Sequence, residues 1–578
     1  MSSKHCFISS VAALFILGAA STCAASENVL NVLDFGAKPN DGINDLTALR
    51  KAVAAAVEQG NCTLYFPPGQ YDLADSQAIH LQNEVMDGKL GNPEPTIFNR
   101  DYSYVTALDF TGANHVTINA KGALFLMDGW MEPVSLQKCT NVTINGLTID
   151  YKRPPNSEGK IISVGTNTVD VQFPSWCPVN EHTPFLRMMV YDEKTSAFGG
   201  GCFGAKGQEL IAPQTLRFKM HNDLCQRGRL LLGWHGFHFR PAILLYQAEN
   251  TVMNNVTIHA QPGMGIVGHL SKDITFNHLK IVPRKGCHIS SNTDATHFVS
   301  CRGTIRFDKC EFGGQGDDSS NVHCFYTDIL SKTPDGHCTL AISRHFETHS
   351  VKRDFPQIGD TLAVIKRSTL EETGYLKVKS VELSNKDWSY TISFEGELPE
   401  DFNNYLVANI TASPALEFLN CHVRSHRARA VLVKTRKVRI ENCLFENVTG
   451  TAIHIGAEGN WMEGVTSADV VIRGNKIVRC GTGEGTIDGA SAIAVHVNAS
   501  NHNVPGLHKR LLFENNQFIG GERAIAIKSA EDVTIRNNIF KEFTGKPIEV
   551  GTSSRVWAFD NKGAEDIRIG DKPALPIQ

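Results

Sequence analysis

Three aspartates stand in two short motifs that could perform acid–base chemistry. Asn292-Thr293-Asp294 precedes Gly316-Asp317-Asp318, and Asp294 and Asp317 are 23 residues apart (317 − 294). If the chain repeats at about this interval, as in a β-solenoid, the two motifs lie on neighbouring coils about 4.8 Å apart. Carboxyl groups that lie close together disfavour each other's ionised form, so one acid can keep its proton while another ionises. Hydrolysis of a glycosidic bond requires this division of roles.

The backbone must bend near the second motif if both of its acids are to face one ligand. Consecutive strand residues point to opposite faces, and Gly313, Gly314 and Gly316 would permit a bend just before Asp317 and Asp318. An inverting hydrolase places its two carboxyl groups about 6.5–9.5 Å apart and a retaining one about 5–5.5 Å apart. One coil of about 4.8 Å plus a sideways offset is compatible with both ranges, so the sequence leaves the mechanism open.

Several polar and aromatic residues near these motifs, or on later coils, are candidates for sugar contact. An aromatic ring can stack on the apolar face of a sugar, and a histidine can bind hydroxyls or tune a carboxylate. For each residue a structural role is the alternative. The candidates are Asn292, His297, His323, Lys434, Arg436, His454 and Trp461. Nothing in the sequence implies a metal ion or an organic cofactor, so we expect neither.

A repeated pattern of aliphatic, asparagine and aromatic residues predicts the architecture. About ten copies recur, at intervals such as 26 (144 − 118), 29 (305 − 276), 22 (440 − 418) and 22 (535 − 513). Such intervals suit a coil of three short strands with one inward face. Asparagine at a tight turn tolerates left-handed backbone and can bond to its neighbours along the stack. We therefore predict an all-β protein with a right-handed parallel β-helix.

Two stretches interrupt the repeat with alternating strands joined by polar turns. This pattern predicts two small inserted antiparallel β modules, of which the second resembles a barrel. The expected boundaries are 26–151 for the N-terminal cap and first coils, 152–250 for the first module, 251–325 for the coils that carry the acids, 326–412 for the second module and 413–578 for the last coils.

The ends of the solenoid and its interior also leave signals. An alanine-rich run predicts a helix over 46–58, with Asp45 as its N-cap, that covers the open edge of the first coil. The chain has 15 cysteines, and some recur at one place in the repeat. We expect these to be buried core thiols rather than disulfides. They are Cys139, Cys310, Cys421 and Cys443.

Composition and the first residues bear on location and partners. The net charge of −4 and the pI of about 6.6 give no indication of nucleic acid or an anionic membrane as a partner. Residues 1–25 are typical of a cleaved signal peptide, and their apolar stretch is shorter than the roughly 20 residues that span a bilayer. No later segment is long and apolar enough to cross one, so we predict an exported protein, periplasmic or extracellular. Lipidation at Cys23 is an alternative with a poor preceding motif. The oligomeric state is open.

The two aspartate motifs resemble the Asn-Thr-Asp and Gly-Asp-Asp motifs of polygalacturonase-type β-helix hydrolases. The whole mature chain, including the tracts 101–104 and 317–323, resembles glycoside hydrolase family 110 more closely. That resemblance implies an exported, inverting, exo-acting α-1,3-galactosidase that releases galactose from blood-group-B-type and related glycans. It also implies Asp317 as proton donor, with Asp294 and Asp318 positioning or deprotonating water.

Other functions stay open. The polygalacturonases also carry Gly-His-Gly and Arg-Ile-Lys motifs, whereas this chain has the stretches 318–323 and 433–436 in their place. This departure disfavours a uronic-acid substrate. A polygalacturonase-like or rhamnogalacturonase-like pectin hydrolase and a non-catalytic glycan-binding solenoid are the alternatives. The sequence does not decide whether branched glycans alone, or linear Galα1,3Gal as well, would be accepted.

Overall fold

The computed structural model describes residues 28–93, 103–334, 336–341, 353–384, 389–483 and 491–577. The predicted signal peptide, with Cys23, lies outside the described residues. Within these ranges, no helix is both long enough and apolar enough to cross a membrane.

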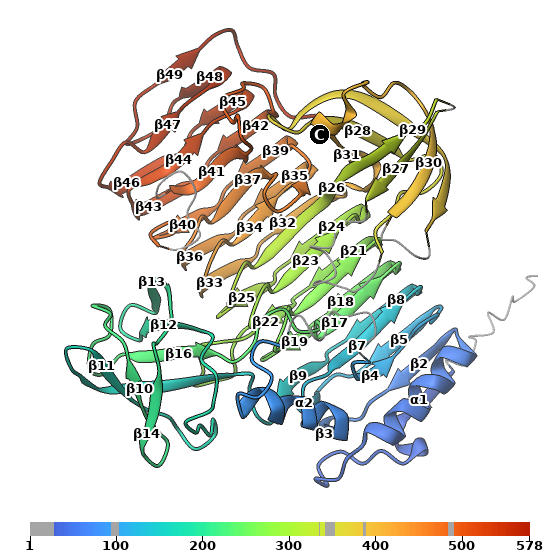
Figure 1. Cartoon of the computed structure of the whole chain (residues 1–578), viewed down its shortest axis with the longest axis vertical. Helices are drawn as coiled ribbons and strands as arrows, with labels where there is room; N and C mark the ends of the chain where they lie inside the picture. The colour runs from blue at the N-terminus through green and yellow to red at the C-terminus, as the bar shows by residue number, and fades with distance from the viewer. Residues whose placement is uncertain are drawn as a thin grey trace, which may run out of the picture.

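The chain winds as a parallel β-helix, and its coils place their strands in three long sheets (Figure 1). The first sheet contains β1 (Val29–Asn31), β2 (Cys62–Tyr65), β5 (Val116–Asn119), β8 (Thr140–Asn145), β18 (Glu249–Asn254), β21 (Lys272–Asn277), β24 (Arg302–Asp308), β32 (Ala415–Leu419), β35 (Arg436–Glu441), β39 (Ala468–Arg473), β42 (His508–Glu514), β45 (Ala530–Arg536), β48 (Ser553–Phe559) and β49 (Ile567–Ile569). The second contains β3 (Gly69–Ala74), β6 (Ala123–Asp128), β9 (Thr148–Tyr151), β19 (Thr257–Ile258), β22 (Lys280–Ile281), β25 (Glu311–Gly313), β33 (His422–His426), β36 (Leu444–Val448), β40 (Lys476–Val478), β43 (Gln517–Gly521) and β46 (Ile539–Phe543). The third contains β4 (Thr106–Asp109), β7 (Glu132–Gln137), β17 (Ile243–Tyr246), β20 (Ile266–His269), β23 (Thr296–Val299), β26 (Ser320–Lys332), β34 (Val431–Val433), β37 (Ile453–Glu458), β41 (Ser491–Asn498), β44 (Arg523–Ile527) and β47 (Ile548–Val550).

The register of the coils follows the repeat, with one exception. Three predicted alignments are confirmed as paired residues: Ile118 with Ile144, Phe418 with Ile440, and Phe513 with Ile535. The predicted alignment of Phe276 with Ile305 is wrong, because Phe276 pairs with Phe307. A bulge shifts the register between Lys272 and Ile274, opposite Gly303, whose φ is +65°. The error of two residues left the same side chains facing inward.

The interior of the helix is a stack of like side chains. The rings of Phe276 and Phe307 stack at 4.9 Å, and Phe418 continues the column towards Phe445 at 6.3 Å. The four recurrent cysteines are all buried, and the 13 cysteines within the described ranges are free thiols. The prediction of core cysteines is therefore confirmed.

In the last coils, one asparagine of each adjacent pair adopts left-handed backbone at the turn, and the next one forms hydrogen bonds between coils. Asn515 and Asn537 have left-handed backbone, with φ of 57° and 56°. The residue after each points inward, and Asn516 donates its side-chain N–H to Oδ1 of Asn538 at 3.0 Å. Such a ladder satisfies buried amide groups between coils.

Helices cover the N-terminal end of the β-helix. The predicted helix is confirmed as α1 (Leu46–Gln59), which buries Leu49 and Val53. Asp45 occupies the N-cap position, but its Oδ1 accepts from the Lys38 backbone N–H at 2.8 Å, so its side chain does not cap the helix. No sequence pattern predicted α2 (Ser76–Met86) or the short 3₁₀ segments η1 (Val32–Phe35), η3 (Phe402–Asn404) and η4 (Ile410–Ala412).

The first interruption of the repeat forms an antiparallel sheet with its own apolar core (Figure 1). Its strands are β10 (Asn156–Val164), β11 (Thr168–Gln172), β12 (Arg187–Asp192), β13 (Ala197–Phe203), β14 (Gln208–Ala212), β15 (Thr215–Lys219) and β16 (Leu230–Trp234). The turn before β13 reaches the later coils: the carbonyl of Ser196 accepts from the Ser425 hydroxyl, and that of Thr195 from the Asn447 amide at 3.3 Å. This sheet therefore bridges early and late coils.

The second interruption is a closed antiparallel barrel that begins inside a strand of the helix. The first half of β26 pairs in parallel with β23 and β34, and its second half pairs antiparallel with the barrel strands. Those strands are β27 (His337–Ala341), β28 (Thr361–Lys366), β29 (Glu371–Leu383), β30 (Ser389–Glu395) and β31 (Tyr405–Asn409). The prediction of two inserted antiparallel modules is confirmed.

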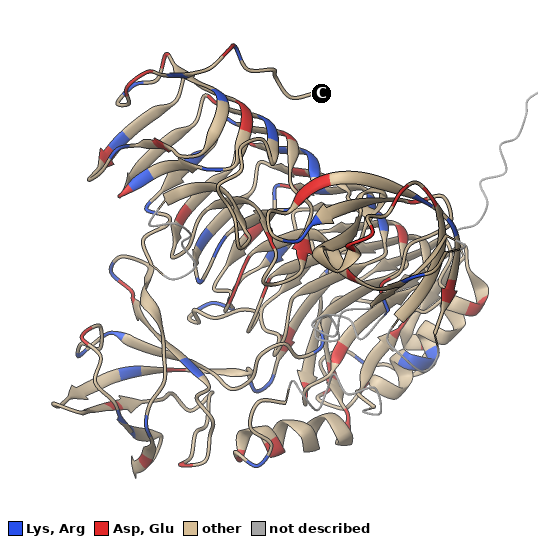
Figure 2. Cartoon of the chain, turned by 45° about the horizontal axis from the view of Figure 1, so that its top comes forward, with Lys and Arg blue, Asp and Glu red and all other residues tan. Residues whose placement is uncertain are grey.

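Charged residues of both signs are spread along the coils (Figure 2). Many form ion pairs between neighbouring strands. Glu514, for example, pairs through Oε1 with Nε of Arg473 and through Oε2 with Nη2 of Arg536, each at 2.7 Å. Partly exposed pairs of this kind each contribute only about 0–1 kcal/mol to stability.

Candidate active site

The three aspartates meet where β23 and β26 begin. Thr296 pairs with Ser320, an offset of 24 residues, and the Ala295 N–H donates to the carbonyl of Asp318 at 2.8 Å. The neighbour of Asp294 on the next coil is therefore Asp318, with Asp317 beside it. The interval of 23 residues in the sequence pointed to the adjacent residue of the pair.

The predicted bend is present between β25 and β26. Asp317 and Asp318 lie in this non-strand segment, so both can turn towards Asp294. One carboxylate oxygen from each of the three aspartates lies within 4.8 Å of the others. Gly316 makes the approach possible, because a Cβ there would stand 2.1 Å from the carbonyl oxygen of Asn292 and 2.6 Å from Nε1 of Trp234.

Three arginines surround the pair of adjacent aspartates. Arg427 Nη1 lies 3.1 Å from Oδ2 of Asp317, and Arg187 Nη1 lies 4.0 Å from the same atom. Arg429 donates two hydrogen bonds to Asp318, from Nη2 to Oδ2 at 3.0 Å and from Nε to Oδ1 at 3.3 Å. Arg187 comes from β12, so the first inserted module contributes a cation to the site.

A second layer of buried charges holds Arg429 in place. Its Nη1 lies 2.8 Å from Oε1 of Glu458, whose other oxygen is 2.6 Å from Nζ of Lys434. Lys434 also pairs with Glu463, and it donates to Oδ1 of Asn321 at 3.2 Å. Removing one partner of such a buried pair leaves an uncompensated charge, so this layer fixes the arginine rigidly.

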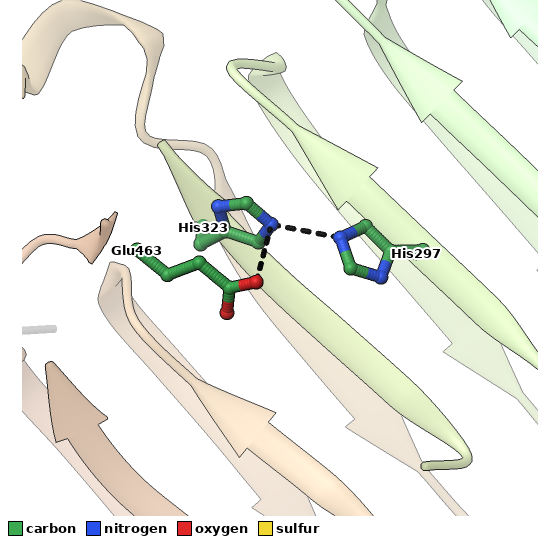
Figure 3. A group of neighbouring side chains, drawn as sticks. All are labelled: His297, His323 and Glu463. Carbon is green, nitrogen blue, oxygen red and sulfur yellow. Dashed lines mark hydrogen bonds and ion pairs between the residues drawn. The ribbon is translucent and has the colours of Figure 1, made fainter. Parts of the chain in front are cut away.

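Two histidines extend the cluster from the other side of Asp294. Nδ1 of His297 lies 2.8 Å from Oδ2 of Asp294, and Nε2 of His297 lies 2.8 Å from Nε2 of His323. Figure 3 shows the two rings meeting edge to edge, with Glu463 beside them at 3.7 Å from His323. Both rings are buried, so they touch Asp294 and each other rather than solvent.

The surroundings separate the pKa values of the three acids. Burial, reinforced by the charge of Asp317, raises the pKa of Asp294 to about 8. Burial raises the pKa of Asp318 to about 7, although Arg429 opposes the shift. Burial also acts on Asp317, but the charges of Arg427, Arg187 and Arg429 outweigh it and hold the pKa of this carboxyl below its ordinary value. Of the three acids, Asp317 is thus the one that ionises most readily.

Three of the remaining candidates are engaged inside the protein. Asn292 is fully buried, and its Nδ2 donates to the carbonyls of Gly236 at 2.8 Å and Pro155 at 3.1 Å, which ties the first module to the acid-bearing coil. Lys434 and His454 are also fully buried, Lys434 in the ion-pair layer and His454 with Nδ1 at 3.4 Å from Nη1 of Arg429. Their places are those of supporting residues.

The last two candidates differ in exposure. Arg436 pairs with Glu372 of the barrel and lines a hollow with Tyr375 and Lys509, apart from the acids. Trp461 is 51% exposed on the turn between β37 and β38 (Glu463–Gly464), whose ends carry Glu458 and Glu463. Of the seven candidates outside the acids, Trp461 is the most exposed.

The sequence did not predict the arginines of the site. Arg427 and Arg429 follow the acids by about one hundred residues, across the barrel insertion, and nothing local marks them. Arg187 belongs to the first module, whose docking is not encoded in the repeat. A search for basic residues at the position in later coils that aligns with Asp318 would have found Arg429, because the Arg429 N–H donates to Asp318 Oδ1 at 2.9 Å.

Two groups have the geometry to receive a cation, the three aspartates and the set of His297, His323 and Glu463. Most of these carboxylates already have a basic partner. Asp317 and Asp318 face arginines, and Glu463 faces Lys434. The donor set therefore does not demand a metal, and the expectation that none is used stays a prediction.

A family model agrees with this architecture. The family model "Right handed beta helix region" matches residues 407–562, and "Rhamnogalacturonase A/epimerase, pectate lyase-like" matches 29–292. An exopolygalacturonase structure from Thermotoga maritima aligns over 95% of each chain at 13% identity, with a TM-score of 0.39.

Relatives named α-1,3-galactosidase match most of the chain. Alpha-1,3-galactosidase B of Bacteroides thetaiotaomicron is 27% identical over 82% of this chain and 78% of its own. Alpha-1,3-galactosidase A of Bacteroides fragilis is 26% identical over 90% and 88%, and that of Shewanella woodyi is 25% identical over 99% and 97%. The predicted resemblance and the right-handed β-helix are confirmed. The chain is a glycoside hydrolase, which sets aside the non-catalytic solenoid.

Proposed function

We propose that this hydrolase is an exported, exo-acting α-1,3-galactosidase that removes terminal galactose from blood-group-B-type glycans and from linear Galα1,3Gal. The observation that carries the proposal is the convergence of Asp294, Asp317 and Asp318 within 4.8 Å, in a chain whose relatives across most of its length are named α-1,3-galactosidases. Export rests on the signal-like residues 1–25.

The acids would divide the reaction between them. Cleavage needs one group that protonates the leaving oxygen and one carboxylate that activates water or attacks the sugar. The resemblance gives the first role to Asp317 and the second to Asp294 and Asp318. A donor at neutral pH needs a raised pKa, and in the free enzyme Asp294 and Asp318 meet this condition better than Asp317. The leaving-group test in the Discussion separates the two assignments.

Inversion is proposed from the resemblance, and retention is its competitor. One oxygen of each carboxylate lies within 4.8 Å of the others, whereas the ranges of roughly 6.5–9.5 Å for inverting and 5–5.5 Å for retaining enzymes refer to whole carboxyl groups, so this contact does not choose between them. Proton NMR of the first-formed product decides. β-Galactose appearing first supports inversion, and α-galactose appearing first replaces it with retention.

The inserted modules would make the enzyme exo-acting by limiting the length of glycan that fits. Arg187 brings the first module to Asp317, and contacts from Thr195 and Ser196 to later coils anchor that module on the same side of the helix. An exposed Trp461 could stack on the apolar face of the terminal sugar. Trp461→Ala should then raise KM for the glycan several-fold and leave kcat nearly unchanged.

Purified protein should be incubated with α1,3-, α1,4- and α1,6-linked galactosides and with polygalacturonate. We expect free galactose from the α1,3-linked substrates alone, including the B trisaccharide, and no release by an Asp294→Asn control. The match to a rhamnogalacturonase model over residues 29–292 favours a pectin hydrolase as the second candidate. New reducing ends from polygalacturonate, without galactose release, would establish that candidate instead.

A further inference from the structure

The hydrogen bonds of His323 fix the protons of the whole histidine pair. Nδ1 of His323 lies 3.1 Å from the carbonyl oxygen of Cys324, an atom that can only accept, so the neutral ring carries its proton on Nδ1. Nε2 of His323 is then a lone pair. Because Nε2 of His297 stands 2.8 Å away, it must supply the proton of that contact.

The same reasoning continues to the catalytic acid. With its proton on Nε2, a neutral His297 presents a lone pair at Nδ1, which lies 2.8 Å from Oδ2 of Asp294. Two lone pairs at this distance repel, so a proton must lie between them. On a neutral ring this proton belongs to Asp294, which then donates a hydrogen bond as a carboxylic acid.

The surroundings of Asp294 also favour a proton on it. Asp294 is buried, and one oxygen of its carboxyl group lies within 4.8 Å of Asp317 and Asp318. Arg427 and Arg429 pair with Asp317 and Asp318, whereas Asp294 contacts His297. A buried carboxylate beside two other carboxyl groups is costly, and a proton on Asp294 removes that cost.

We infer that Asp294 enters the reaction protonated, and that His297 and His323 are positioning residues that hold its proton through a relay of two imidazole rings. The inference deepens the proposed function and rests on it for its catalytic meaning. It also gives the two histidines a role other than sugar contact.

The relay moves one proton without changing the total. The proton on Oδ2 of Asp294 passes to Nδ1 of His297 as the Nε2 proton of His297 passes to Nε2 of His323. The product is an Asp294 carboxylate and a His323 imidazolium, 3.7 Å from Oε1 of Glu463. Return of both protons restores the neutral acid. Burial lowers the pKa of His297 to about 4 and that of His323 to about 3, so the resting proton stays on Asp294.

Other charged groups face the relay and set its balance. Asp317, Asp318 and Glu463 are the anions around it. Arg429, Lys434 and His238 are the positively charged groups that act on it. Anions and cations both surround the two imidazole rings. The hydrogen bond from His323 Nδ1 to the Cys324 carbonyl therefore decides which atom carries the resting proton, because it fixes the tautomer of His323.

A metal ion between the two Nε2 atoms and Glu463 is the competing explanation of the facing lone pairs. A catalytic zinc ion takes three protein ligands and a water, so the three residues match it in number. The Lys434 ammonium already pairs with Glu463, and it would repel a dication bound to the same carboxylate. The proton therefore fits this site better than the metal.

Titration of the full mature chain, labelled with ¹³C at the aspartate carboxyl carbons, tests the inference without using activity. The resonance that disappears in Asp294→Asn belongs to Asp294. We expect it to report a protonated acid at pH 6, well above the ordinary pKa of about 3.9. A midpoint near the ordinary value would overturn the inference even if the enzyme releases galactose, and failure to release galactose would leave this result standing.

A pair of substitutions at His323 tests the relay itself. In His323→Leu, His297 can move its proton to Nδ1 and donate to the Asp294 carboxylate, which should lower the Asp294 midpoint and the alkaline limb of kcat/KM by about one pH unit. In His323→Gln, the amide oxygen keeps an acceptor near the Nε2 position, so the midpoint should stay close to wild type.

Equal midpoints in the leucine variant and the wild type would overturn the relay. So would zinc bound in a 1:1 ratio to the purified protein, if its removal by a chelator displaced the imidazole resonances of His297 and His323. A downward shift in His323→Leu, with rescue by His323→Gln, supports it, because a merely structural defect would not respond to the acceptor.

Discussion

Gly316→Ala tests whether the close approach of two coils places the acids. The new Cβ would lie 2.1 Å from the Asn292 carbonyl oxygen, whereas Cβ contacts below 3.0 Å are essentially never found, so the segment must move by about 0.9 Å (3.0 − 2.1). Neither neighbour yields easily, since Asn292 belongs to a buried backbone segment and the indole of Trp234 is fully buried. The Gly316 carbonyl also accepts from Arg427 at 2.8 Å, so this arginine would move with it.

A displacement of about 1 Å at a catalytic group can cost about 100-fold in rate, and overpacking costs about 1–3 kcal/mol of stability. We therefore expect kcat for galactose release from Galα1,3Gal to fall about 100-fold in a protein that still folds, as checked by its thermal unfolding. Gly204→Ala is the matched control, because its Cβ would meet no atom within 4 Å, and it should keep full activity. A folded Gly316→Ala enzyme with wild-type kcat would refute the claim that this contact positions Asp317.

Three further predictions concern the charges of the site, and one concerns metal. A dinitrophenyl galactoside needs no protonation of its leaving group. Among Asp294→Asn, Asp317→Asn and Asp318→Asn, the variant of the proton donor should therefore keep activity on this substrate and lose activity on the natural one. Equal loss on both substrates in all three variants would refute a separate donor. Arg429→Met should lower the free energy of unfolding by about 3–5 kcal/mol, because it leaves the buried carboxylates of Asp318 and Glu458 without this cation. The Arg439 side chain is 49% exposed, so Arg439→Met should cost about 0–1 kcal/mol in the same denaturant titration. The raised pKa values of Asp294 and Asp318, about 8 and about 7, mean that these two groups bind more protons in the folded state than in the unfolded state, so their contribution to stability is fully present below about pH 4 and is lost as pH rises to about 8. Buried histidines with lowered pKa values act in the opposite direction in this window, so the contribution is measured as the difference in unfolding free energy between wild type and Asp294→Asn. This difference should fall as pH rises from about 4 to about 8, and a difference that grows would contradict the raised pKa. Chelation should leave galactose release unchanged, and loss of activity restored by a divalent cation would overturn the metal-free mechanism.

The repeating coils could be predicted because their signal is local and occurs many times. Each coil carries its own inward-facing residues and turn asparagines, so an error such as pairing Phe276 with Ile305 did not change the predicted face. The exact partner of Asp294 depended on the length of one bend, between β25 and β26, which the repeat does not specify. One residue there decides between Asp317 and Asp318.

The basic side of the site was harder to predict, for geometric reasons. Lys434 and Arg436 were both candidates for sugar contact, but β34 ends at Val433 and β35 begins at Arg436, so a corner of the coil separates their directions. Arg187 lies 130 residues before Asp317 (317 − 187). It reaches the site only because an antiparallel module folds back over the helix, and no periodic pattern records that contact.

The anchoring of the turn at Thr195 and Ser196 on Ser425 and Asn447 limits how this protein can change length during evolution. A coil inserted or deleted between the two ends of that bridge would separate them by about 4.8 Å, enough to break the hydrogen bonds and to pull Arg187 away from Asp317. A second bridge spans the last coils, because the Ile577 backbone N–H donates to Oδ1 of Asp469 at 2.8 Å, so homologous sequences should avoid whole-coil indels between these two residues as well.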